Sequence, residues 1–228
     1  MSGFVLPPPD QPSVAIRGSD KRFPVRRIFC VGRNYAEHAR EMGNDPDKEP
    51  PFFFTKPADA LVASGATIPY PPMTGDLHHE AELVIAIGVA GHDIPPDVAL
   101  THVWGYAAGN DLTRRDLQAE AKATRRPWDM AKGFDRSAVI GPLVQSADGH
   151  PPQGRIRCLV DGAVRQDADL GDMIWPVADI IACLSRLVEL RPGDLIYTGT
   201  PAGVGAVGRG QSCTVEIDGL DAATVTLA

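Results

Sequence analysis

The chain has 228 residues, and its apolar residues, 43% of the total, are enough to bury a sizeable core in one large domain. With 23 glycines, 21 prolines and only 6% aromatic residues, the composition indicates many turns and short elements, which argues against a helical bundle. The net charge of −7 opposes non-specific binding of nucleic acid. The longest uncharged, mainly apolar stretch, from Leu83 to Gly91, is too short to span a bilayer.

The first 24 residues are rich in proline and polar side chains, and we expect them to form an arm that lies on the domain. They contain neither the basic region nor the apolar stretch of a secretory signal. The four cysteines are far apart and include no CxxC pair, which argues against a disulfide framework or a zinc knuckle. We therefore expect free thiols and a cytoplasmic location.

Short apolar runs, separated by glycine and proline, predict the elements of the N-terminal half. In chain order these are a strand over 26–32, a helix capped by Asn34 and ended by Gly43, a loop over 46–57 that enters an edge strand, strands over 80–89 and 104–109, and a helix over 114–124.

In the C-terminal half, a strand over 155–160 is expected to return through the Asp161-Gly162 turn as a hairpin. The prediction is completed by a helix over 175–187, with Pro176 in its first turn, and by strands over 195–198, 213–217 and 223–227. Because regular alternation of strands and helices is missing, we expect an α+β fold dominated by β structure and not a doubly wound parallel sheet.

Two glutamates begin the strand predicted over 80–89. Residues i and i+2 of a strand face the same side, so the carboxylates of Glu80 and Glu82 repel each other unless a cation, a proton or an arginine lies between them. Asp111, at the end of the next predicted strand, can supply a third oxygen donor. Three carboxylates suit a hard cation such as Mg²⁺ or Mn²⁺ better than Zn²⁺. Taken alone, the spacing is more typical of a solvated strand edge.

His78 and His79 precede these glutamates and raise the alternative of a zinc site. No HExxH sequence follows, and adjacent residues of a strand point to opposite faces. We therefore interpret the two histidines as flanking residues.

Two further sets of residues have spacings that suit catalysis. His38 and Glu41 lie one turn apart on the first predicted helix, where a carboxylate can orient an imidazole that acts as a general base on water. Taken alone, the pair is more typical of an exposed ion pair. Arg115 lies four residues after Asp111 and Gln118 three residues after Arg115, close to one helical face, and an arginine there can bind a substrate carboxylate through two parallel hydrogen bonds.

A glycine-rich segment near the C-terminus contains GxGxxG at Gly203, Gly205 and Gly208. It follows a predicted strand but precedes another strand, so no helix N-terminus is available for the pyrophosphate of a dinucleotide. We interpret it as an active-site loop whose backbone amides, with the hydroxyl of Thr200, meet an anion.

Taken together and in order, these segments resemble the fumarylacetoacetate hydrolase family. Beside the His38/Glu41 pair, the resemblance depends on VGRNY at 31–35, FTKP at 54–57, HEAEL at 79–83, NDLTRRD at 110–116, KGFD at 132–135 and TGTP at 198–201. Within the family, the chain is most similar to the bacterial branch that hydrolyses fumarylpyruvate, on the basis of RFPVRR at 22–27, PPFFF at 50–54, RPW at 126–128 and DMIW at 172–175.

The resemblance implies a mainly β, roll-like α+β fold, with an N-terminal arm over 1–25 and one catalytic domain over 26–228, and it implies a homodimer. It also implies one Mg²⁺ or Mn²⁺ per chain. The residues that it assigns are Glu80, Glu82 and Asp111 as metal ligands, His38, Glu41 and Lys132 as catalytic residues, and Arg115, Gln118 and Thr200 as substrate contacts.

The activity that the resemblance implies is hydrolysis of a carbon–carbon bond in an acylpyruvate, from fumarylpyruvate to fumarate and pyruvate, in aromatic degradation through gentisate. Related members use the same site as oxaloacetate decarboxylases, or as isomerases and decarboxylases of catechol-derived diacids. A non-catalytic module that binds a metal or a sugar acid is a third interpretation, and it would not need the His38/Glu41 pair.

Overall fold

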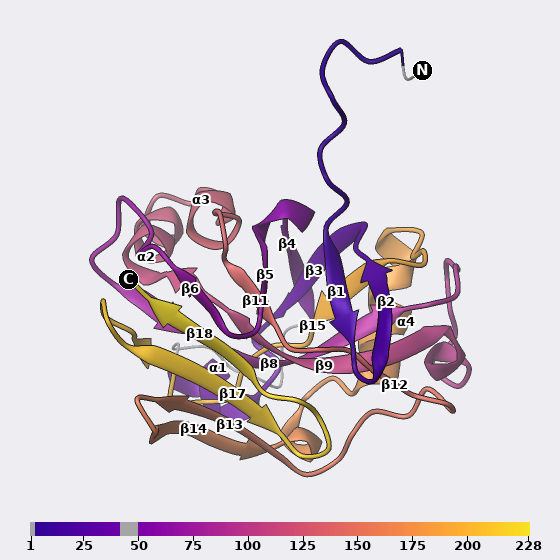
Figure 1. The fold of residues 1–228 in the computed structure, drawn as a ribbon. Coiled ribbons are helices and arrows are strands. Elements are labelled where there is room, and N and C mark those ends of the chain that lie inside the picture. The colour runs from indigo at the N-terminus through magenta and orange to yellow at the C-terminus, as the bar shows by residue number, and fades with distance from the viewer. Residues whose placement is uncertain (1–2, 42–49) are drawn as a thin grey trace.

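The computed structural model describes residues 3–41 and 50–228, in which two large sheets pack against each other (Figure 1). In spatial order, the eight-stranded sheet contains β4 (Phe52–Lys56), β3 (Arg27–Gly32), β15 (Asp194–Tyr197), β8 (Ala81–Ile87), β9 (Val103–Asp111), β11 (Ala138–Ile140) and β5 (Leu61–Ala63), with β12 (Val144–Gln145) paired to β9. The five-stranded sheet contains β14 (Ala163–Asp169), β13 (Arg155–Val160), β17 (Ser212–Ile217), β18 (Ala223–Leu227) and β6 (Ala66–Ile68).

Smaller elements complete the described part of the chain. A three-stranded sheet contains β10 (Thr113–Arg114), β7 (Leu77–His79) and β16 (Gly205–Ala206), and a hairpin contains β1 (Ser13–Ile16) and β2 (Ser19–Pro24). The helices are α1 (Ala36–Glu41), α2 (Arg115–Ala123), α3 (Asp129–Lys132) and α4 (Val177–Leu187), with short 3₁₀ turns at Ala58–Ala60, Ala99–His102 and Leu170–Asp172. The fold is therefore mainly β with a few short helices, as the sequence predicts.

The two central strands of the larger sheet, β8 and β9, determine where the acidic residues lie. Every residue of β8 is buried, as expected for a strand that is covered on both faces. The antiparallel register places Ala81 opposite Asn110, and the backbone N–H of Asp111 donates to the carbonyl oxygen of Glu80 at 2.9 Å. The register therefore brings the start of β8 and the end of β9 side by side.

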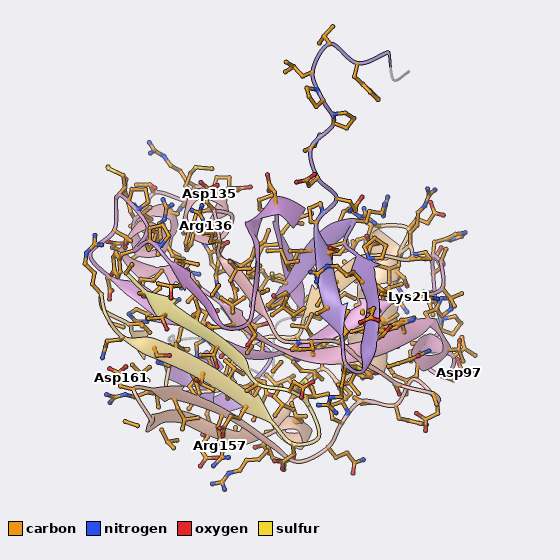
Figure 2. All side chains as sticks on the ribbon, viewed as in Figure 1. Lys21, Asp97, Asp135, Arg136, Arg157 and Asp161 are labelled. Carbon is orange, nitrogen blue, oxygen red and sulfur yellow. The ribbon has the colours of Figure 1, made fainter. Side chains whose placement is uncertain are left out.

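Apolar side chains of β8 alternate between two cores. Leu83 and Ile85 belong to the core that fills the space between the two large sheets. Val84 and Ala86 belong to a second core on the opposite face, where the β1–β2 hairpin packs and contributes the buried Phe23. The alternation follows the period of two of a strand, and charged side chains such as Lys21 and Asp161 lie at the surface (Figure 2).

The predicted elements are confirmed to within three residues at each end wherever the chain is described. The glycine-rich segment runs through β16 into β17 without an intervening helix, as expected. The pattern did not predict several short elements, namely β1, β2, β5, β6, β7, β10, β11, β12, β16 and α3.

The N-terminal segment differs from a simple arm. Residues 13–24 form the β1–β2 hairpin, and its side chains Val14 and Phe23 are buried. The preceding residues from Gly3 onwards extend away from the sheets (Figure 1). The division into an arm over 1–25 and a catalytic domain over 26–228 stays a prediction.

Two expectations about the chain's chemistry can be compared directly with the structure. All four cysteines lie in the described part, and none forms a disulfide. No helix in that part has the length and the apolar character that a bilayer crossing requires.

The buried side chain of Asn34 connects three segments of the fold. Its amide nitrogen donates to the carbonyl oxygens of Trp175 and Thr198 at 3.0 and 2.8 Å, and its oxygen accepts from the N–H of Trp175 at 2.7 Å. We predicted that Asn34 caps the first helix, but that helix begins at Ala36, so Tyr35 occupies the capping position. Asn34 instead links the chain before α1, through hydrogen bonds, to Trp175 before α4 and to Thr198 after β15.

We expect Asn34→Ala to destabilise the protein by about 2–4 kcal/mol, because it removes three hydrogen bonds and leaves buried backbone groups without partners. Urea unfolding followed by circular dichroism measures this change. The control is Gln11→Ala, which removes one part-buried hydrogen bond from an exposed side chain to the carbonyl oxygen of Val25 and should cost less than about 1 kcal/mol. Equal stability of the two variants would contradict the stabilising role of the Asn34 hydrogen bonds.

Candidate active site

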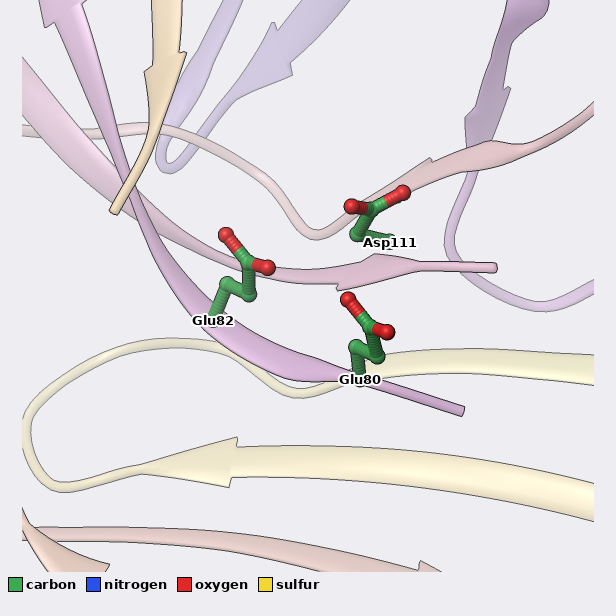
Figure 3. Close-up of side chains that lie close together, drawn as sticks. All are labelled: Glu80, Glu82 and Asp111. Atoms are coloured by element: carbon green, nitrogen blue, oxygen red, sulfur yellow. The ribbon is translucent and has the colours of Figure 1, made fainter. Parts of the chain in front are cut away.

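Three acidic side chains meet where β8 begins and β9 ends (Figure 3). Glu80 directly precedes β8, Glu82 is its second residue, and Asp111 is the last residue of β9. All three are buried, and each offers a carboxylate oxygen within 4.8 Å of the others. The structure brings these residues together as their spacing predicts, whereas their role as metal ligands stays a prediction.

Cationic side chains surround two of the three carboxylates. Lys132 Nζ lies 2.7 Å from Glu80 Oε2 and 2.6 Å from Asp111 Oδ2. Lys56 Nζ lies 2.7 Å from Asp111 Oδ1, and Arg115 Nη2 lies 2.5 Å from Glu80 Oε1. Burial alone would raise the pKa of Glu80, but the charges of Lys132 and Arg115 hold it well below its usual range. Glu80 is therefore ionised throughout the physiological range.

Glu82 lacks comparable compensation. Its Oε2 accepts a hydrogen bond from the N–H of Gly199 at 2.7 Å, and no cationic side chain of the described residues forms an ion pair with it. Burial, together with the charges of Asp111 and Glu80, raises the pKa of Glu82 well above its ordinary value. A divalent cation would offset this penalty, and the all-oxygen donor set is the one that Mg²⁺ and Mn²⁺ prefer. The residues present therefore fit the predicted cation.

Gly199 can approach Glu82 because it has no side chain. Its φ of 94° lies in the region that favours glycine, and a Cβ atom there would lie only 2.7 Å from the Cβ of Asn34. The contact between Asn34 and this loop therefore also fixes the position of the N–H group that supports Glu82.

His38 lies on α1 and lines the same pocket as Glu80, Glu82 and Thr200. Its side chain is buried. The backbone of Glu41 ends α1, but its side chain lies outside the described part of the chain. The predicted orientation of His38 by Glu41 therefore stays a prediction.

Arg115 and Gln118 are neighbours on α2, as their spacing predicts, with Arg115 Nη1 donating to Gln118 Oε1 at 2.6 Å. The remaining contacts of the guanidinium are to Glu80 and to the ring of His78. We expected Arg115 to bind a substrate carboxylate. The structure engages its donors with protein groups, so a substrate would have to share them.

The two adjacent histidines have hydrogen-bond partners other than the three clustered carboxylates. His78 Nε2 lies 2.9 Å from Asp76 Oδ1, and His79 Nδ1 lies 3.0 Å from Gln166 Oε1. Burial lowers the pKa of both rings. These contacts agree with the interpretation of His78 and His79 as flanking residues.

Gln166 fixes the position of Thr200. Its Nε2 donates to Thr200 Oγ1 and to the carbonyl oxygen of Pro201, both at 2.8 Å, while its Oε1 accepts from the N–H of Ala81 at 3.0 Å. Because Thr200 Oγ1 accepts from Gln166, the hydroxyl proton of Thr200 can be donated to a different group. Thr200 lines the pocket, so that group can be a bound substrate.

Sequence reasoning did not single out two buried residues that contact the site. Lys56 is fully buried at the end of β4, and we noted it only as part of the FTKP segment. A lysine that closes an apolar strand is a detectable signal, since lysine is rarely buried without a partner. Gln166 is the one buried residue of β14, and nothing in the surrounding sequence distinguishes it from its exposed neighbours.

We expect Glu82→Gln to weaken Mn²⁺ binding by about 100-fold, because one of three anionic ligands is lost. The thermal midpoint of the metal-free variant should equal or exceed that of the parent, since repulsion from Glu80 and Asp111 is relieved. Titration calorimetry and thermal unfolding measure the two effects.

A matched control is Glu216→Gln, which makes the same chemical change at a residue that pairs with Arg157 outside the pocket. Its Mn²⁺ affinity should match that of the parent protein. Unchanged Mn²⁺ affinity in Glu82→Gln would exclude Glu82 as a ligand.

Comparisons with known proteins agree with the fold and identify the family. The model for the C-terminal part of fumarylacetoacetate hydrolase matches residues 27–228. A fumarylpyruvate hydrolase of Ralstonia sp is 44% identical, covering 82% of this chain and 98% of the relative, and a mitochondrial oxaloacetate tautomerase of Arabidopsis thaliana is 43% identical, covering 85% and 87%. The crystal structure of fumarylpyruvate hydrolase from Pseudomonas aeruginosa in complex with Mn²⁺ and pyruvate is 55% identical, covers 99% of both chains and has a TM-score of 0.95. The chain therefore belongs to the fumarylacetoacetate hydrolase family.

Proposed function

We propose that this protein is a metal-dependent hydrolase that cleaves a carbon–carbon bond of an acylpyruvate, with fumarylpyruvate as substrate and fumarate and pyruvate as products. The observation that carries the proposal is the placement of the buried cluster Glu80, Glu82 and Asp111 in one site with His38 and Lys132. The similar Pseudomonas aeruginosa structure, with Mn²⁺ and pyruvate bound, supports both the cation and the pyruvyl product.

Cleavage requires water to attack the 4-oxo carbon of the substrate. The bond between carbons 3 and 4 then breaks, and its electron pair leaves with the pyruvyl part as an enolate that is protonated to pyruvate. A divalent cation held by Glu80, Glu82 and Asp111 would act as a Lewis acid for the pyruvyl carboxylate and 2-oxo group and stabilise the charge of the enolate.

His38 is our candidate for the general base. Imidazole is the side chain whose ordinary pKa lets it accept a proton near pH 7, and His38 lines the pocket from α1. Glu41 follows one turn later on the same helix, at a spacing that suits orientation of the ring.

Lys132 is suited to electrostatic stabilisation rather than proton abstraction. Burial alone would lower the pKa of Lys132, but the carboxylates of Asp111 and Glu80 raise it above its ordinary value. The ammonium group therefore keeps its proton and places a fixed positive charge beside the carboxylates. Thr200, positioned by Gln166, can donate its hydroxyl proton to a substrate oxygen.

Oxaloacetate chemistry is the second candidate, because tautomerases that are 36% to 43% identical to this chain carry that name. Oxaloacetate is also a 2-oxo acid, and decarboxylation or tautomerisation also passes through an enolate. Parallel assays of fumarylpyruvate and oxaloacetate with the Mn²⁺-loaded protein distinguish the two activities. Preferential turnover of oxaloacetate would overturn the proposed hydrolysis.

We expect His38→Ala to lower turnover of fumarylpyruvate by about 10²–10⁴-fold, the usual contribution of a general base. Oxalate, an unreactive analogue, should bind the Mn²⁺-loaded variant with near-normal affinity, because the carboxylate cluster is unchanged. Steady-state kinetics and calorimetry provide the two measurements.

Two outcomes of this experiment would contradict the role of His38. Retained turnover would assign the base to another residue, and loss of oxalate binding would give His38 a binding or structural role. A protein without catalytic turnover that still binds Mn²⁺ and oxalate would be the non-catalytic module considered above.

We also propose that the protein is a homodimer, on family resemblance, and that it is cytoplasmic, because its four cysteines are free thiols. Sedimentation equilibrium at micromolar concentration should give about twice the chain mass of 24.3 kDa. A single species at the mass of one chain would contradict the dimer.

A further inference from the structure

Two cationic side chains of the pocket have no part in the reaction described above. Arg33 directly follows β3, and Lys122 lies in the last turn of α2. Both line the pocket that also contains Glu80, Glu82 and His38. Both side chains can therefore contact a substrate that occupies the pocket.

Arg33 and Lys122 lie over two aromatic rings that contact each other. Arg33 Cζ lies 5.3 Å from the ring centroid of Phe52, and Lys122 Nζ lies 5.2 Å from that of Trp128. The two rings meet edge to face, with centroids 5.3 Å apart and planes at 80°. Cation–π contacts therefore hold both cations along one aromatic wall of the pocket.

The charges around Lys122 favour an anion as ligand. Burial, followed by the nearby charges of Arg115 and Arg33, lowers the pKa of Lys122. Within the described residues, no carboxylate forms an ion pair with Lys122. A bound carboxylate would form charge-assisted hydrogen bonds with the ammonium group of Lys122.

The backbone of Arg33 gives independent support. Its φ is 62°, a conformation that is uncommon for residues other than glycine, asparagine and aspartate. Such strained residues are found where the position of a side chain matters for function. Arg33 has this conformation where the chain leaves β3, at a position that lines the pocket.

Helix α2 runs along the pocket, from Arg115 beside the carboxylate cluster to Lys122. Arg115, Gln118 and Lys122 follow at offsets of three and four residues, so they lie on one face. Arg115 contacts Glu80, and Lys122 lies about 10 Å further along the helix axis at 1.5 Å per residue. The four-carbon side chain of lysine can bridge part of that distance in either direction.

We propose that Arg33 and Lys122 bind the distal carboxylate of the substrate's acyl arm, so that the pocket selects acylpyruvates with a carboxylate at each end. This inference rests on the proposed function and names the substrate class of the same site. The aromatic wall of Phe52 and Trp128 would lie along the flat, conjugated part of the arm.

Chain length supports this selection. The seven carbons of fumarylpyruvate span roughly 7–8 Å between the terminal carboxyl carbons, as estimated from C–C bonds of about 1.5 Å. This length suits a ligand that reaches from the carboxylate cluster towards Lys122. Oxaloacetate has four carbons and spans roughly 4 Å, so it cannot occupy both ends.

A matched pair of unreactive ligands tests the proposal. 2-Oxoheptanedioate and 2-oxoheptanoate have the same carbon chain and the same 2-oxo acid group, and only the first has a distal carboxylate. Calorimetry with the Mn²⁺-loaded protein should give at least tenfold tighter binding of the diacid. Lys122→Met should weaken the diacid by about 10- to 100-fold and leave the monoacid unchanged, and Arg33→Met should act in the same direction.

Two controls separate a direct contact from other effects. Lys122→Arg keeps the charge and should restore most of the diacid's affinity. Lys21→Met removes one positive charge from the exposed strand β2, away from the pocket, and should change neither ligand's affinity (Figure 2). A loss of diacid binding in Lys21→Met equal to that in Lys122→Met would indicate general electrostatic attraction and overturn the proposal.

The binding measurements are independent of turnover. Equal affinity of the parent protein for the two ligands, or equal weakening of both by Lys122→Met, would overturn the distal subsite. Failure to hydrolyse fumarylpyruvate, combined with selective binding of the diacid, would overturn the proposed function alone. Kinetics should agree with binding, with kcat/KM of Lys122→Met falling about 10- to 100-fold for fumarylpyruvate and less than about twofold for 2,4-dioxopentanoate.

Discussion

The repulsion among three buried carboxylates is the constraint on which the rest of the site depends. The pairing of β8 with β9 brings oxygens of Glu80, Glu82 and Asp111 within 4.8 Å of one another at buried positions. An uncompensated buried charge is very costly, so each carboxylate needs a partner. Lys132 and Arg115 compensate Glu80, and Lys132 and Lys56 compensate Asp111. Within the described residues, Glu82 forms no ion pair and accepts from the backbone N–H of Gly199, and a divalent cation would supply the compensation that it lacks.

Compensation by lysine also gives the site a fixed geometry. Lys56 Nζ donates to the backbone carbonyl oxygens of Leu112 and Lys132 in addition to its ion pair with Asp111. The same side chain therefore connects β4, the chain after β9 and the end of α3. Lys56 binds the carbonyl oxygen of Lys132, and Lys132 binds Asp111. These two contacts hold the short helix α3 against the sheet. A short helix of four residues could not keep Lys132 in place by its own stability.

The sequence predicted those parts of the fold and of the site that depend on a local pattern of residues. The alternation in Glu80-Ala81-Glu82 placed two carboxylates on one side, and the Asp161-Gly162 pair located the β13–β14 hairpin. The three-stranded sheet of β7, β10 and β16 was not predictable, because strands of two or three residues have no readable period and pair only through the tertiary fold. Gln166 was missed for the same reason. Its importance depends on contacts with Thr200 and His79, both far away in the chain.

The two ends of the pocket have different roles, one in the reaction and the other in the choice of substrate. A divalent cation held by the carboxylate cluster would stabilise an enolate whatever acid the pyruvyl part is attached to, which agrees with the sequence similarity of this chain to both a fumarylpyruvate hydrolase and an oxaloacetate tautomerase. A common catalytic end cannot by itself decide among those substrates. Discrimination must therefore come from groups that meet the part in which the substrates differ, and on this chain those groups lie along the wall formed by Phe52 and Trp128. On this proposal, the carboxylates at the start of β8 hold the cation for the reaction, and the cations near the end of α2 select the substrate.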